Sequence, residues 1–223
     1  MQTLFRNPLA GPFVLGISSG ASLGAALLIM GASLFSGLFS FNIFNDATLA
    51  IASSVGSFVV LFSVLSVAMK VKDTMSLLIV GLMFGSITGA IVSILSYFTT
   101  AEKLQQYIYW SFGSLGDLSW SQLSLLSCII VIGIFLSILS IKSLNALLLG
   151  ENYAKSMGVQ LKKSRLIIII ATGLLAGSIT AFAGPIAFIG LAVPHLTRQI
   201  FNTTNHKILV PAVLVYGAII MLV

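Results

Sequence analysis

The sequence predicts an all-α membrane protein whose helices cross the bilayer several times. Hydrophobic residues make up 58% of the 223-residue chain, charged residues make up only 7%, and the mean hydropathy is +1.12. A soluble domain carries about 25% charged residues, so a chain this apolar needs lipid as its solvent. The apolar residues gather in long runs, and a helix satisfies every backbone polar group of such a run inside a bilayer.

Seven apolar runs are the predicted spans, and a span needs about 20 residues at a rise of 1.5 Å per residue. In chain order they cover residues 12–30, 48–69, 74–98, 120–141, 166–182, 185–200 and 208–223. The sixth run is short for a span, and the last run stops without a polar flank, which suggests an incomplete chain. Between the third and fourth runs, Tyr109 and Trp110 predict an interfacial aromatic belt or a short re-entrant helix.

Basic residues decide the predicted orientation. Lys103 stands alone in one set of alternate connections, whereas the other set holds Arg6, Lys70, Lys72, Lys142, Lys155, Lys162, Lys163, Arg165, Arg198 and Lys207. Cytoplasmic connections carry an excess of Lys and Arg, so we expect the N-terminus and segment 142–165 in the cytoplasm. The net charge of +6 does not indicate nucleic-acid binding, because the charges lie between spans and form no stripe with interleaved aromatics.

Segment 142–165 is the one long polar stretch between apolar runs, and we expect it to form two short helices. Ser143 can cap the first helix and Gly150 can end it, while Glu151 opens the second and Gly158 ends it. Glu151 shares a helix face with the lysine four residues later. A compact, basic helix pair between two spans indicates a docking surface on the cytoplasmic side.

Small residues at four-residue spacing predict close helix crossings, because lipid gives helices no hydrophobic reason to associate. Three runs carry such rows, which are Gly16, Gly20 and Gly24, then Gly81, Gly85, Gly89 and Ser93, then Gly173 and Gly177. The third run also carries the hydroxyl residues Ser76, Ser86, Thr88 and Ser96. Two interpretations of these hydroxyls stay open. They line a water-filled path, or they bond to the backbone of their own helix.

Residues 16–20 fit the G-x-S-x-G pattern of serine hydrolases, whose nucleophile needs a strand–turn–helix setting. In a membrane span, glycine packing explains the pattern better. The alternative function is an intramembrane serine hydrolase that uses Ser18 and His195, although no third residue to orient the histidine is apparent. His195 and Arg198 form an H-x-x-R pair near the inner end of the sixth run, where they hold a helix end or take part in gating.

Other chemistry is disfavoured. The chain has no Walker A motif, no dinucleotide-binding glycine loop and no acidic pair at catalytic spacing, so it has no evident means of hydrolysing ATP. His206 is the only histidine besides His195 and no carboxylate cluster accompanies them, so we expect neither a metal site nor a cofactor. A secondary transporter would be expected to carry an ionisable residue deep in a span, and no Asp or Glu lies within a predicted span.

Four stretches in a specific order and spacing carry a family resemblance. They are RNPLAGPFVLGISSGASLG at 6–24, WSFGSL at 110–115, LNALLLGENYAKSMGV at 144–159 and GPIAFIGLAVPHLTR at 184–198. With these stretches, the sequence resembles the permease subunits of bacterial ABC importers for iron–siderophores, haem and cobalamin, which are the FecCD or vitamin B12 type.

The resemblance implies a ten-span permease of the type II ABC importer fold, which works as a homodimer or a heterodimer. The implied partners are an ABC ATPase subunit, an extracytoplasmic substrate-binding protein and the lipid of the bacterial cytoplasmic membrane. Residues 1–223 would then form one partial permease domain, truncated by two spans before Arg6 and one after Val223. The family's contacts for the binding protein lie largely in those parts, and an inactive permease fragment is the other alternative.

The resemblance also implies roles for particular residues. The ATPase-coupling residues would be Leu149, Gly150, Glu151, Ala154, Lys155 and Gly158. The translocation path and its cytoplasmic gate would use Lys72, Asp73, Thr74, Gly81, Gly85, Gly89 and Ser93. The helix-packing and motif residues would be Arg6, Asn7, Pro8, Gly16, Gly20, Pro194, His195 and Arg198.

Overall fold

The computed structural model describes residues 1–31, 46–70, 74–116, 118–186 and 188–222, which form helices and loops without a strand. The predicted all-α class is confirmed. The helices in chain order are α1 (Gln2–Phe5), the 3₁₀ helix η1 (Pro12–Leu15), α2 (Ile17–Ile29), α3 (Asp46–Lys70), α4 (Thr74–Phe98), α5 (Ala101–Phe112), α6 (Trp120–Leu139), α7 (Ile141–Leu148), α8 (Glu151–Ser156), α9 (Leu161–Ala183), α10 (Ile189–Phe201) and α11 (His206–Leu222).

Four helices are long and apolar enough to cross a membrane. They lie in α3, α4, α6 and α9, over Thr48–Lys70, Met75–Phe98, Trp120–Leu139 and Leu161–Ala183. These helices correspond to the second, third, fourth and fifth predicted runs. α2 and α11 are also apolar but have only 13 and 17 residues, so by length alone four of the predicted runs form helices that could cross a membrane within the described part of the chain.

A glycine in the left-handed backbone conformation divides the first predicted span. Gly16 has φ +69°, a conformation that L side chains rarely adopt, and it ends η1 immediately before α2 begins. A Cβ atom at Gly16 would lie 2.9 Å from the carbonyl oxygen of Gly81, so the close approach to α4 also requires glycine. The expected continuous span over 12–30 is therefore a 3₁₀ turn followed by a short α-helix.

Two residues with positive φ shorten the sixth predicted span. Gly184 follows the last residue of α9 at φ +80°, and Phe188 precedes α10 at φ +72°. As a result, α10 begins at Ile189 rather than at Pro185, and its 13 residues extend about 20 Å. This length falls short of the roughly 30 Å hydrocarbon core of a bilayer.

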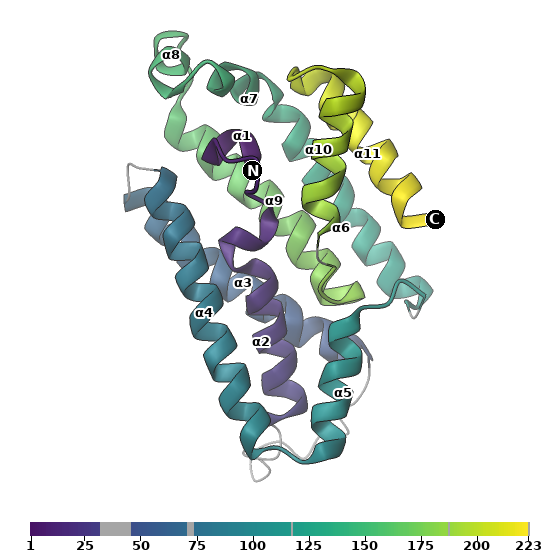
Figure 1. The fold of residues 1–223 in the computed structure, drawn as a ribbon. Helices are drawn as coiled ribbons and strands as arrows, with labels where there is room; N and C mark the ends of the chain where they lie inside the picture. Colours follow the sequence, from purple (N-terminus) through teal and green to yellow (C-terminus); the bar gives the residue numbers. More distant parts are fainter. Residues whose placement is uncertain (32–45, 71–73, 117, 187, 223) are drawn as a thin grey trace.

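α2 packs against α3, α4 and α9 (Figure 1). Its crossing with α3 is close, because a Cβ atom at Gly20 would lie 2.6 Å from the carbonyl oxygen of Gly56, and one at Gly24 would collide with the carbonyl of Ala52. A Cβ atom at Gly177 of α9 would lie 3.3 Å from the side chain of Ile17 of α2, which is a tight contact. The glycine rows of the first and fifth runs therefore mark helix crossings, as predicted.

The glycine row on α4 behaves differently along its length. A Cβ atom at Gly81 would collide with the carbonyl oxygen of Val14, so this part of α4 crosses η1 closely. A Cβ atom at Gly89, two turns further along, would meet nothing within 4 Å. The predicted close crossing is confirmed at Gly81 and is wrong at Gly89, although Leu95 further along α4 is buried against Ala26 and Ile29 of α2.

The two ends of the bundle are built differently. α1, α7 and α8 lie together at one end, and α5 lies at the opposite end (Figure 1). α4 starts near α8, since Met75 lines the same hollow as Arg6 and Glu151. The basic helix pair and the N-terminal segment thus share one end, while Lys103 belongs to α5 at the other end.

Candidate functional site

The end of the bundle formed by α7 and α8 exposes large apolar side chains beside basic ones. We call Leu148, Leu149, Tyr153, Lys155 and Met157 the docking surface, and all five side chains are exposed. Leu149 is 64% exposed and Met157 is 60% exposed. Exposed apolar groups on a charged connection between spans indicate contact with another protein, because lipid does not cover them there.

Buried residues hold the two short helices in place beneath this surface. Leu147 and Ala154 belong to the core cluster that also contains Phe5 and Ile169. Ala154 is completely buried, so only a small side chain fits between α8 and the core. Gly158 ends the segment at φ +81°, which fits its predicted role as the stop signal. The predicted helix pair is therefore present, with Gly150 between its members.

One detail of this helix pair differs from the sequence-based expectation, and one contact adds to it. α7 begins at Ile141, after Ser140, so Ser143 does not cap it. Ser143 instead accepts a hydrogen bond from the hydroxyl of Ser164 at the start of α9, with 3.0 Å between the oxygens. Glu151 forms an ion pair with Arg165 of α9 at 3.6 Å, and its side chain is 34% exposed. Glu151 therefore links α8 to α9, while Lys155 on the same short helix is exposed.

Arg6 lies against the turn that joins α7 to α8. A Cβ atom at Gly150 would lie 3.3 Å from the guanidinium Nη2 of Arg6, and Gly150 has φ +109°, so both space and backbone favour glycine. Arg6, Glu151 and Tyr153 line a hollow of about 650 Å³ between α1, the start of α4 and this turn. Arg6 thus contributes to the same end of the molecule as the docking surface.

The turn after α1 is held by its own side chains. Asn7 accepts a hydrogen bond from the backbone N–H of Leu9 at 2.9 Å, and Gln2 donates to the carbonyl oxygen of Pro8 at 2.7 Å. Arg6 itself has φ +47°, an uncommon conformation for a residue with a side chain. The Arg-Asn-Pro sequence is therefore a fixed turn that places the guanidinium of Arg6 over Gly150.

The four stretches that carry the family resemblance meet one another in space. Besides the contact between Arg6 and Gly150, a Cβ atom at Gly190 would lie 3.3 Å from Pro12. A Cβ atom at Gly184 would lie 2.7 Å from the Cα atom of Gly113, so the WSFGSL stretch packs directly on the GPIAF stretch. Residues that are far apart in the sequence thus form the joints between α1, α5, α7 and α10.

α4 carries the residues predicted to border a path. Gly81 is buried, Gly85 is half-buried, and Gly89 and Ser93 are exposed. The hydroxyls of Ser86, Thr88, Ser93 and Ser96 each donate to a carbonyl oxygen of α4 itself, at 2.8 to 3.1 Å. These bonds agree with the backbone-bonding interpretation, and the path stays a prediction. Thr74 is the first residue of α4, whereas Lys72 and Asp73 lie outside the described residues.

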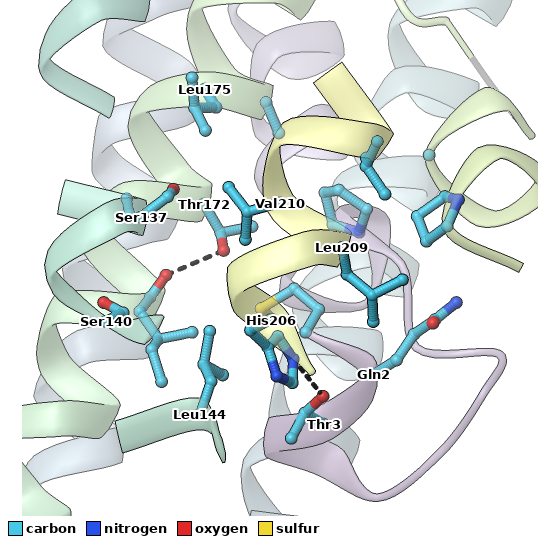
Figure 2. A pocket seen from close by; sticks show the side chains of 18 of the residues that line it. Gln2, Thr3, Ser137, Ser140, Leu144, Thr172, Leu175, His206, Leu209 and Val210 are labelled. Atoms are coloured by element: carbon cyan, nitrogen blue, oxygen red, sulfur yellow. Dashed lines mark hydrogen bonds between the residues drawn. The ribbon is translucent and has the colours of Figure 1, made fainter. Parts of the chain in front are cut away.

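The predicted motif residues of α10 lie in different surroundings. Pro194 and Arg198 line a cavity of about 390 Å³ between α1, α6, α9, α10 and α11. His195 is exposed, and its Nε2 atom lies 3.2 Å from the amide nitrogen of Gln199 one turn later. The cavity walls are mainly apolar, and Figure 2 shows their side chains pointing into the space around Leu209 and His206.

A buried polar cluster links three segments at the same end of the bundle. The Nε2 atom of His206 lies 3.0 Å from the hydroxyl of Thr3 (Figure 2), and the Nδ1 atom lies 2.8 Å from the side-chain oxygen of Asn145. His206 is only 7% exposed. Thr3 belongs to α1, Asn145 to α7 and His206 to α11, so this cluster joins the docking helices to the end of the chain.

Comparison with known proteins identifies the family of the chain. A model of the FecCD transport family matches residues 1–223, which is the whole sequence. The chain belongs to that family. The vitamin B12 import system permease protein BtuC of Klebsiella pneumoniae is 35% identical over 219 residues, covering 98% of this chain and 63% of BtuC.

Two further proteins similar to this FecCD family member are also described as ABC transporters. A provisionally named ABC transporter permease of Methanocaldococcus jannaschii is 37% identical over 226 residues, covering 99% of this chain and 62% of that protein. A solved structure is described as the inward-facing conformation of an ABC transporter, provisionally of the metal-chelate type. It has a TM-score of 0.86 and 30% identity, and covers 99% of this chain and 68% of its own. The FecCD chain thus spans less than two thirds of the curated relatives it matches.

The geometry does not assemble the alternative hydrolase site. The hydroxyl of Ser18 lies 3.3 Å from that of Thr180, and His195 is bonded to Gln199. Ser18 lies on α2 with no strand before it among the described residues, so the G-x-S-x-G pattern lacks the turn that exposes a nucleophile. These contacts give Ser18 and His195 partners other than each other, and the named relatives are transport permeases, so nothing here supports the serine hydrolase interpretation.

Sequence reasoning missed the cluster of Thr3, Asn145 and His206. Its members are separated by 61 and 203 positions, so no local spacing relates them. The available signal was weak. Asn145 is a polar residue beside the apolar residues Leu144 and Ala146, and His206 stands two residues before an apolar run.

Proposed function

We propose that this FecCD family chain is a transmembrane permease subunit of an ABC importer, driven by ATP hydrolysis in a separate subunit. The observation that carries the proposal is the docking surface. It combines exposed apolar side chains with the exposed Lys155 at two short helices, in a family whose named relatives are ABC transporter permeases. The sequence carries no phosphate-binding loop, which supports placing ATP hydrolysis in a separate subunit.

The proposed mechanism is a movement of α7 and α8 that follows nucleotide binding in the ATPase subunit. Leu149, Tyr153 and Met157 would fill a groove of the ATPase, and Lys155 would face its acidic rim. Buried Ala154 and the ion pair between Glu151 and Arg165 would transmit the movement from α8 to the core and to α9. The membrane helices would then open alternately to the two sides of the membrane.

The proposed pathway lies at the interface of two permease subunits, alike or different. α4 is exposed along most of its length, and its small residues Gly85, Gly89 and Ser93 would border the path. The connection before Thr74, with Lys72 and Asp73, would form the cytoplasmic gate. A second permease subunit would close this path, because Gly89 and Ser93 are exposed in the single chain.

The proposed cargo is a metal chelate of the siderophore, haem or cobalamin class, delivered by an extracytoplasmic substrate-binding protein. BtuC, a relative of this chain, is named for vitamin B12 import, and the structural neighbour is described as a metal-chelate type transporter. The proposed location is the bacterial cytoplasmic membrane, with the N-terminus and the docking surface in the cytoplasm, since the basic connections share that side.

The docking proposal can be tested with Tyr153→Ala and Lys155→Glu, made separately and together. Both side chains are exposed and neither lies in the core, so the changes leave the permease fold intact. We expect the affinity for the cognate ABC ATPase to fall about tenfold or more for the pair, as when an aromatic interface anchor is lost. Co-purification and binding of the detergent-solubilised subunits measure this affinity.

A matched control is Lys103→Glu, a charge reversal on α5 at the opposite end of the bundle. It should leave ATPase binding unchanged. Equal recovery of the ATPase with the double variant and with the parent chain would refute the docking surface. The cargo class is tested separately, by uptake of radiolabelled cobalamin, haem and ferric hydroxamate into proteoliposomes that contain the complete transporter.

A further inference from the structure

The donor and acceptor roles of the two ring nitrogens of His206, the buried histidine at the start of α11, follow from the chemistry of their partners. The side-chain oxygen of Asn145 can only accept, so the Nδ1 atom of His206 donates to it across 2.8 Å. The Nε2 atom of the neutral ring then accepts from the hydroxyl of Thr3 across 3.0 Å. Both ring nitrogens are thereby satisfied inside the protein, as burial requires.

Asn145 also completes the beginning of α11. Its side-chain oxygen accepts a second hydrogen bond, from the backbone N–H of His206, at 2.9 Å. Its amide nitrogen donates to the side-chain oxygen of Asn205 at 2.9 Å. The first N–H groups of a helix have no partner within the helix, and a residue just before the helix usually satisfies one of them. At the start of α11, Asn205 accepts from the N–H of Lys207 at 3.0 Å, and Asn145 of α7 satisfies the N–H of His206 in addition.

α10 and α11 form a hairpin that rests mainly on α7. The rings of Phe201 and Tyr216 meet edge to face with 6.0 Å between centroids, which ties the two helices together. Outside the hairpin, the principal packing partner of these helices among the described residues is α7. The cavity of about 390 Å³ separates Val213 and Leu214 of α11 from Ile134 of α6. The hairpin therefore has room to move relative to α6.

Asn145 stands one turn before the docking surface. Leu148, the last residue of α7, and Leu149, its C-cap residue, follow Asn145 by three and four residues, so they lie on the same side of this segment. A helix this short moves as one body. A displacement of the exposed leucines therefore also displaces the side chain of Asn145. This side chain accepts two hydrogen bonds from His206, the first residue of α11.

We propose that Asn145 and His206 are positioning residues that transmit movement of the ATPase-docked helix α7 to the α10–α11 hairpin. This inference rests on the proposed function, because it needs an ATPase subunit to displace α7. Thr3 holds the far side of the histidine ring, so the imidazole stays oriented toward α7. Neither Asn145 nor His206 belongs to the docking surface, and their loss leaves the ATPase contact in place.

The test measures hairpin movement directly and needs no knowledge of the cargo. Spin labels are attached to cysteines at Val131 of α6 and Val215 of α11, both well exposed, in a Cys128→Ser background. The complete permease–ATPase complex is placed in lipid nanodiscs. The distance between the labels is then measured without nucleotide and after trapping with ATP and vanadate.

We expect the distance to change on trapping in the parent complex and the change to be lost with His206→Leu or Asn145→Leu, while the ATPase still co-purifies. Asn145→Asp keeps the oxygen that accepts both bonds from His206, so it should retain the change. If leucine prevents assembly, Asn145→Ser replaces it, because serine is too short to reach the ring.

The inference is overturned if the parent complex shows no distance change on trapping, or if His206→Leu shows the same change as the parent. It is also overturned if Asn145→Asp loses the distance change as Asn145→Leu does. That result would mean that the hydrogen bonds accepted from His206 do not transmit the movement. Failure of the parent chain to bind any ATPase would instead refute the proposed function.

Discussion

Glycines at the joints of this molecule set how closely its segments approach. Gly81 is the sharpest case, because an added Cβ atom would collide with a backbone oxygen of η1, which cannot rotate away as a side chain can. Gly150 is required for a different reason, since it combines a positive φ with the guanidinium of Arg6 nearby. The absence of a Cβ atom at these two positions thus allows the observed placement of α4 and of the docking helices.

Replacing Gly81 with alanine should therefore destabilise the protein by about 2 kcal/mol, as overpacking of a tight interior does. The measurement is the thermal unfolding midpoint of the purified chain in detergent.

Gly89→Ala is the matched control, on the same helix and in open space. It should leave the midpoint unchanged or raise it slightly, because alanine favours a helix over glycine. Equal losses at the two positions would contradict the assigned crossing of α4 and η1.

At the scale of elements, α8 is fixed by two different contacts. Ala154 buries its small side chain in the core, and Glu151 pairs with Arg165 of α9. A partly exposed ion pair contributes at most about 1 kcal/mol, so burial does most of the anchoring. Glu151 then acts on ATPase binding through the position of α8 rather than through a contact of its own.

This assignment predicts a specific pattern of ATPase affinities. Glu151→Gln and Arg165→Gln should each lower the affinity by no more than about fivefold, the range of one partly exposed ion pair. The double variant should be no worse than either single variant, because both remove the same interaction. Binding measurements on the four proteins test this, and independent, multiplying losses would show that Glu151 contacts the ATPase directly.

The elements also show where sequence patterns suffice. The run 74–98 coincides with α4, and the segment around Gly150 folds into the two predicted short helices, because hydrophobic length and glycine stops act locally. The breaks at Gly16 and Phe188 escaped prediction. Each depends on contacts or backbone conformations set by packing between segments, which apolar length alone does not reveal.

The cluster of Thr3, Asn145 and His206 marks the same limit at the candidate site. The docking helices could be placed from charge and helix signals within one segment. The hydrogen bonds that connect them to α11 join residues up to 203 positions apart, so only the folded chain brings them together. The family resemblance supplied the fold but no role for these three residues.

At the scale of the whole molecule, α1, α7 and α8 lie at one end of the bundle (Figure 1), and the proposed function places this end in the cytoplasm. The most direct measurement is labelling of a cysteine at Gln160, an exposed residue just before α9, with a membrane-impermeant thiol reagent in a Cys128→Ser background. Gln106→Cys on α5, at the opposite end, is the control. The account predicts that Gln160→Cys reacts only after the cells are permeabilised, whereas Gln106→Cys reacts in intact cells. Ready labelling of Gln160→Cys from the external medium would contradict the orientation and the docking of an ATPase on α7 and α8.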